Sequence, residues 1–165
     1  VGDAFTTGGI DVTASDFTFS NGLTFSGGSA DVTISSLAGG SGQEMGINNI
    51  LLNFATGPTT ALSMAFGEYG GNINLLINGV FQNVENFADV DSFDFGGALA
   101  SVVGGLGNDQ GTLLLTGSIS SFAIGGQELW IDDISTAPAV PLPGAAVLLL
   151  AGLGGLSAFK RRATA

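Results

Sequence analysis

The stretch Asn72-Ile73-Asn74-Leu75-Leu76-Ile77-Asn78-Gly79-Val80-Phe81-Gln82-Asn83-Val84 holds the clearest structural signal in this chain of 165 residues. An apolar run ends at Ile77 and a second run begins at Val80, with only Asn78-Gly79 between them. Both residues of this pair readily adopt the positive φ angles that a two-residue hairpin turn requires. The stretch therefore predicts two antiparallel strands, 72–77 and 80–84, joined by a tight turn.

Short runs of the same kind, in which β-branched or aromatic residues alternate with polar ones, continue along the chain as far as Ile134. Turn pairs such as Asn21-Gly22 and Gly57-Pro58 separate them. The further runs are 10–13, 17–20, 23–25, 31–35, 47–54, 61–66, 111–116, 118–124 and 128–134. Short strands with such frequent turns predict an all-β fold, an antiparallel β-sandwich of the jelly-roll kind, over residues 1–137.

Three segments carry weaker signals. Residues 98–103 fit a short helix and a strand equally well. Residues 136–138 are expected to form a linker to the C-terminal stretch. The chain begins with Val1 and not with methionine, so the N-terminus is expected to be processed or truncated, with an export signal removed.

The composition excludes several classes of function. The chain has no Cys and no His, which removes disulfides, zinc–thiolate sites and the commonest general base. Its three basic residues are Lys160, Arg161 and Arg162, so residues 1–159 hold fourteen acidic residues and no basic residue. Phosphate binding needs Lys or Arg, which excludes nucleic acid as a partner. Catalysis would rest on carboxylates alone, and we expect that the protein is not an enzyme.

The C-terminal stretch has three parts in a fixed order. Val140-Pro141-Leu142-Pro143-Gly144 contains two prolines that cannot lie inside a helix. Residues 144–159 carry no charge, and as a helix they would reach roughly 24 Å, a short span for a bilayer core of about 30 Å. The basic cluster, Lys160 to Arg162, is expected to stay on the cytoplasmic side. The stretch predicts a single transmembrane helix, with the preceding domain on the other side of the membrane.

This C-terminal stretch resembles the PEP-CTERM class of bacterial sorting signals, in its Val-Pro-Leu-Pro-Ala variant (VPLPA-CTERM). Val140, Pro141, Leu142 and Pro143 match the variant, and Gly144 stands where it usually has Ala. The resemblance implies processing by a membrane enzyme of the exosortase type. It also implies export in a Gram-negative bacterium, membrane anchoring before processing, and then a place at the cell surface or in an extracellular matrix or biofilm, with exopolysaccharide. The alternative is an ordinary membrane anchor that is never cut.

The body of the chain carries a looser resemblance. Residues 66–72, the Asn78-Gly79 turn and residues 122–134 look like jelly-roll domains that precede exosortase signals. Residues 122–134 are also similar to the final strand of jelly-roll carbohydrate-binding modules. In those modules the position equivalent to Asp133 often holds a structural calcium ion, so the resemblance implies calcium at this residue.

Acidic residues supply the candidate metal site. With Leu129 and Ile131 facing inward, the two-residue period of a strand places Asp133 inward at the strand end. A buried carboxylate needs backbone donors or a metal, and Asp3 or Asp11 would complete a calcium shell. The run 89–94, which contains three aspartates, does not match an EF-hand loop and is a calcium loop of another kind or a set of solvated acids.

Two aromatic residues supply the candidate ligand site. Sugar binding by stacking usually needs an exposed Trp or Tyr, and the chain has one of each, Trp130 and Tyr69. Glu68 lies beside Tyr69 and is the candidate polar partner. We therefore expect a non-enzymatic cell-surface or matrix protein, and the alternative is a calcium-dependent carbohydrate-binding module.

Overall fold

The computed structural model describes residues 2–7, 9–40 and 42–138. The sorting motif, the apolar segment and the basic cluster of the C-terminal stretch lie outside these residues. Within the described ranges, no helix is long and apolar enough to cross a membrane.

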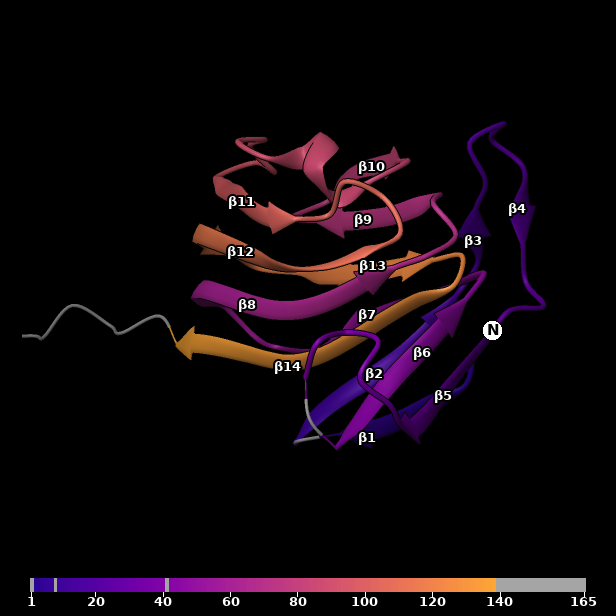
Figure 1. Cartoon of the computed structure of the whole chain (residues 1–165). Helices are drawn as coiled ribbons and strands as arrows, with labels where there is room; N and C mark the ends of the chain where they lie inside the picture. Colours follow the sequence, from indigo (N-terminus) through magenta and orange to yellow (C-terminus); the bar gives the residue numbers. More distant parts are fainter. Residues whose placement is uncertain (1, 8, 41, 139–165) are drawn as a thin grey trace, which may run out of the picture.

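The described chain forms two six-stranded antiparallel sheets, so the predicted all-β, antiparallel class is confirmed (Figure 1). The first sheet has the order β1 (Ala4–Thr7), β2 (Ile10–Ser15), β7 (Ile50–Phe54), β13 (Phe122–Gly126), β9 (Ile73–Ile77) and β10 (Val80–Val84). The second has the order β11 (Ala98–Gly104), β12 (Asp109–Ile119), β8 (Thr59–Glu68), β14 (Leu129–Pro138), β6 (Gln43–Asn48) and β5 (Ser29–Ile34). A small hairpin, β3 (Phe17–Thr18) with β4 (Thr24–Phe25), and a 3-10 helix, η1 (Phe87–Val90), complete the fold.

The Asn78-Gly79 hairpin is present as predicted. Val80 pairs with Ile77 across the turn, and both turn residues have positive φ, 51° for Asn78 and 79° for Gly79. The undecided segment 98–103 is a strand, because it forms most of β11 and pairs along its length with β12.

Three boundaries differ from the prediction. The run 47–54 is two strands and not one, because Asn49 has a φ of 54° and turns the chain from β6 in the second sheet to β7 in the first. The run 118–124 is also two strands, because its start belongs to β12 in the second sheet and its end to β13 in the first. Residues 136–138 are not a linker, since they extend β14 along β8 as far as the pair Pro138–Thr59.

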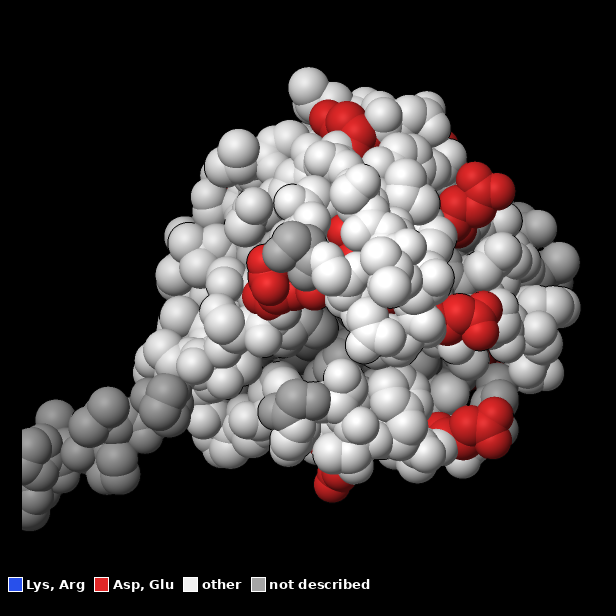
Figure 2. Space-filling model, turned by 60° about the horizontal axis from the view of Figure 1, so that its bottom comes forward, with Lys and Arg blue, Asp and Glu red and all other residues white. Residues whose placement is uncertain are grey.

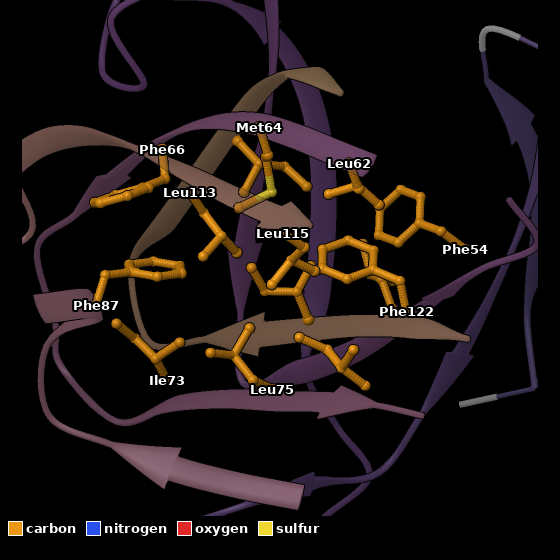
Figure 3. Packing of buried hydrophobic residues seen from close by; sticks show 14 of the residues in the cluster. Phe54, Leu62, Met64, Phe66, Ile73, Leu75, Phe87, Leu113, Leu115 and Phe122 are labelled. Atoms are coloured by element: carbon orange, nitrogen blue, oxygen red, sulfur yellow. The ribbon is translucent and has the colours of Figure 1, made fainter. Parts of the chain in front are cut away.

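The hydrophobic core lies between the two sheets (Figure 3). Leu62, Met64 and Phe66 alternate along β8, and none of the three is exposed to solvent, as the two-residue period of a strand requires. Phe87 at the start of η1 stacks on Phe66 with 3.9 Å between ring centroids. The core is therefore closed at this end by a helical turn that packs against the end of β8.

Candidate functional site

The two candidate aromatic residues meet in one groove on the outer face of the second sheet. Trp130 of β14 and Tyr69, which follows β8, both line a cavity of about 430 Å³. Because Leu129 and Ile131 face the core, Trp130 faces outward and is half-buried. Two-residue alternation along β14 thus puts Trp130 on the outer face of the second sheet.

Glycines flank Trp130 on both neighbouring strands, and Gly46 lines the groove. Gly46 of β6 and Gly67 of β8 are the cross-strand partners of Trp130. A Cβ atom on Gly46 would lie 3.0 Å from the indole ring, so the ring lies against the bare backbone of β6. A Cβ atom on Gly67 would lie 1.8 Å from the carbonyl oxygen of Leu37. Glycine is therefore needed at both positions, once for the indole ring and once for the loop that carries Leu37.

Leu37, in the connection between β5 and β6, lines one side of the groove. The hydroxyl of Tyr69 donates a hydrogen bond of 2.8 Å to the carbonyl oxygen of Leu37. The side-chain amide of Gln110 also donates to the Leu37 carbonyl, at 3.2 Å. The loop thus holds the Tyr69 ring in place at the edge of the groove.

Polar groups surround the two aromatic rings. Glu128 and Asp31 are exposed acids that line the groove, and Asp31 is the cross-strand partner of Gly46. The other polar lining residues are Ser29 and Asn48. Carboxylate and amide oxygens accept hydrogen bonds from hydroxyl groups, and the aromatic rings offer apolar faces. This combination suits a hydroxyl-rich ring such as a sugar.

Glu68 does not belong to the groove, so its prediction as a ligand residue is wrong. The side chain is 2% exposed, because Glu68 continues the inward-facing series of β8. Its two carboxylate oxygens accept hydrogen bonds from the backbone N–H groups of Phe87, at 2.8 Å, and Gly107, at 2.7 Å. Burial raises the pKa of Glu68 above its ordinary value of 4.5, and the two N–H groups oppose the rise. Glu68 therefore anchors η1 and the 104–108 loop.

Asp133 is exposed, so the prediction that it points inward is wrong. The pairing of β14 with β8 shifts between Asp132 and Ser135, and Asp133 has a φ of 51°, which marks a β-bulge. The extra residue breaks the two-residue alternation that the prediction assumed.

The expected calcium shell around Asp133 is not brought together. Asp133 lines a cleft at the end of the sandwich beside Thr7 and Ile10, and Asp3 and Asp11 do not line this cleft. The carboxylate of Asp11 instead accepts a hydrogen bond of 2.7 Å from the hydroxyl of Thr6. Across the described ranges, no three acidic side chains gather closely enough to hold a metal ion together.

The three aspartates of the run 89–94 each bind a nearby backbone group. Asp89 accepts from the N–H of Asn86, Asp91 from that of Val102, and Asp94 from that of Gly97, all within 3.0 Å. These bonds hold η1 and the start of β11 in place. The carboxylates are thus structural anchors of this turn.

Figure 2 shows acidic side chains at several separate places on one face of the domain, with no basic side chain among them. Two further acids, Glu44 and Asp132, lie beneath residues 37–40 of the connection between β5 and β6, and sequence reasoning missed Glu44. Glu44 is 1% exposed. Its charge and its neighbours Gln43 and Met45 do not indicate that the side chain is buried. The one sequence signal was Gly46, since a glycine inside a strand indicates a close approach by another group.

Comparison with known proteins gives no relatives for this chain. No family model matches it, and no curated protein and no solved structure gives a match. Functional inference therefore rests on the sequence of the tail and on the geometry of the domain.

Proposed function

We propose that the chain is a non-enzymatic, exported cell-surface protein whose β-sandwich binds extracellular polysaccharide. The observation that carries the binding proposal is the meeting of Trp130 and Tyr69, the chain's sole Trp and Tyr, in one groove with acidic and amide groups around them. The order of the strands supports a jelly-roll-like domain, because consecutive strands from β6 to β9 and from β12 to β14 alternate between the sheets.

The proposal of export rests on the C-terminal stretch. Its proline motif, apolar segment and basic cluster resemble an exosortase sorting signal, which would anchor the precursor and then be removed. The proposal that the protein is not an enzyme rests on side-chain chemistry. Residues 1–159 have no His, Cys, Lys or Arg, and both carboxylate oxygens of Glu68 accept hydrogen bonds from backbone N–H groups.

The binding proposal predicts that Trp130→Ala strongly weakens binding to one class of polysaccharide. A buried Trp contact at the centre of a binding surface is typically worth about 2 kcal/mol or more, which corresponds to roughly a 30-fold loss in affinity. The measurement is a glycan array followed by titration, with the full chain kept in mild detergent. Trp130→Phe, which keeps an aromatic face, is expected to retain part of the affinity.

Phe81→Ala is the matched control for this experiment. Phe81 is a 41% exposed aromatic residue on β10 of the first sheet, far in strand order from the groove. Its substitution should leave glycan binding unchanged. Silence of the wild-type protein across the whole array would favour a purely structural or adhesive protein, and equal losses in both variants would place the binding surface elsewhere.

The sorting proposal predicts that the mature protein ends near Pro143 and lacks the apolar segment. The intact mass of protein extracted from the cell surface tests this. Replacing Pro141 and Pro143 with Ala should block processing while leaving membrane insertion unchanged, since the apolar segment is not altered. A surface protein whose mass includes Lys160 to Ala165 would show that the stretch is an ordinary anchor.

A further inference from the structure

The further inference concerns the carboxylates of Glu44 and Asp132, which both lie under residues 37–40 of the connection between β5 and β6. The β6–β14 ladder ends with the pair Met45–Ile131, and Glu44 and Asp132 are the residues next to this pair. Both therefore face outward, on the face that also carries Trp130. Figure 1 shows the connection between β5 and β6 passing over this part of β14.

Each of these carboxylates uses one oxygen for the backbone. Oε2 of Glu44 accepts hydrogen bonds from the N–H groups of Leu37, at 2.8 Å, and Ala38, at 3.1 Å. Oδ1 of Asp132 accepts from the N–H of Asp133 at 2.8 Å. The loop is thus fastened to Glu44 through its own backbone.

The second oxygen of each carboxylate is buried without a partner. Oε1 of Glu44 and Oδ2 of Asp132 have essentially no solvent contact and no hydrogen bond within the described part of the chain. Glu44 is 99% buried as a residue, since its exposed fraction is 1%. Gly40 covers Asp132 so closely that a Cβ atom there would lie 1.9 Å from Oδ2. A buried, unpaired charge of this kind destabilises the fold unless a cation or a donor compensates it.

The sequence supplies no cationic side chain to compensate these charges, because residues 1–159 contain neither Lys, Arg nor His. A side chain from a partner protein would have to displace the loop residues that cover these oxygens. We propose that a calcium ion binds between Oε1 of Glu44 and Oδ2 of Asp132. Calcium suits the ligands because it takes carboxylate and carbonyl oxygens in flexible geometry, with water completing the shell.

This site would connect cation binding to the groove. The loop that covers the two carboxylates also carries the Leu37 carbonyl, which accepts the hydrogen bond of Tyr69. An ion that neutralises Glu44 and Asp132 would therefore fix the loop and, through it, one aromatic wall of the groove. The metal site itself is argued from the buried oxygens alone and does not depend on polysaccharide binding.

The test is thermal unfolding of the full chain in EDTA, in millimolar calcium chloride, and in sodium chloride of matched ionic strength. Isothermal titration calorimetry with calcium alone measures binding directly. Calcium at a hundredfold excess over its Kd is expected to raise Tm by on the order of 5–10 °C above the sodium control. Glu44→Gln and Asp132→Asn should each remove this rise, because an amide nitrogen can take the place of the unpaired oxygen. Both variants keep an oxygen for the backbone donors, and in EDTA they should melt no lower than the wild type.

Asp133→Asn is the matched control, because it neutralises the neighbouring exposed carboxylate and should keep the full calcium response. Equal shifts of Tm with calcium and sodium, with no heat of calcium binding, would overturn the proposal. So would a calcium-specific rise that survives in both Glu44→Gln and Asp132→Asn. A failure of the glycan array alone would count against the groove and leave these outcomes unaffected.

Discussion

Replacing Phe87 with Ala is expected to destabilise the fold by about 3–5 kcal/mol. The Phe87 side chain is fully buried, and its ring stacks on Phe66 with 3.9 Å between centroids. Its removal would leave a cavity where η1 closes the end of the core, and the ring of Phe66 would lose its stacking partner. Folded domains are typically stable by only about 5–15 kcal/mol, so this single change would remove a large fraction of the total.

Chemical denaturation of the wild type and the variant measures this loss. Phe81→Ala makes the same chemical change at a side chain that is 41% exposed, and it should cost on the order of 1 kcal/mol or less. Phe87→Leu, which refills most of the volume, should recover part of the loss. A Phe87→Ala protein as stable as the Phe81→Ala protein would show that η1 does not contribute to the core.

The sequence predicted the fold class well because antiparallel hairpins are encoded locally. Asn78-Gly79 favours a tight turn whatever the rest of the fold is, and the structure has this turn. The number of strands in the run 47–54 was not predictable in this way. Its polar residues are Asn48, Asn49 and Asn53, none of which breaks a strand by itself. The chain changes sheet at Asn49 through a positive φ, which Asn tolerates but does not require.

The candidate site was predicted in part for a related reason. Alternation along one strand accounts for the outward side chain of Trp130, because β14 is regular from Leu129 to Ile131. The same rule failed at Asp133, because the β-bulge adds one residue to β14 and nothing in the local sequence indicates this bulge. Glu44 and Asp132 lie at the same end of the β6–β14 ladder because these two strands are neighbours, and the order of the strands is decided by the whole core and not by either segment.

Alternation also contained a signal for Glu68 that was not used. Leu62, Met64 and Phe66 face inward, and the next residue in the series is Glu68. Two-residue periodicity therefore indicates a buried carboxylate at the end of β8. What the sequence could not supply were its two donors, Phe87 and Gly107, which lie 19 and 39 residues away.

Removing the Glu68 carboxylate is expected to have the second large effect on stability. Glu68→Ala would leave the N–H groups of Phe87 and Gly107 without their acceptor, and each unsatisfied buried group costs about 1–3 kcal/mol. Glu68→Gln keeps one acceptor oxygen and should lose about half as much. Glu85→Gln, at an exposed glutamate, is the control and should change the free energy of unfolding by less than about 0.5 kcal/mol.

The pH dependence of the same variants tests the electrostatic environment of Glu68. Burial raises its pKa in the folded protein, the charges of Asp109 and Asp89 add to the rise, and the two backbone N–H groups oppose it. The folded state therefore binds the proton more tightly than the unfolded state, whose pKa is close to 4.5. The contribution of Glu68 to stability is fully present below that pH and is lost as the pH rises through the raised folded value.

Denaturation of the wild type and Glu68→Gln at several pH values between about 4.5 and 8 isolates this contribution, because the other acids titrate in both proteins. The stability difference between the wild type and Glu68→Gln should widen as the pH falls. A difference that narrows on acidification would mean that the N–H groups of Phe87 and Gly107 outweigh desolvation and hold the folded pKa below 4.5. The direction of the change therefore decides whether burial or hydrogen bonding dominates at this carboxylate, whatever the size of the stability loss.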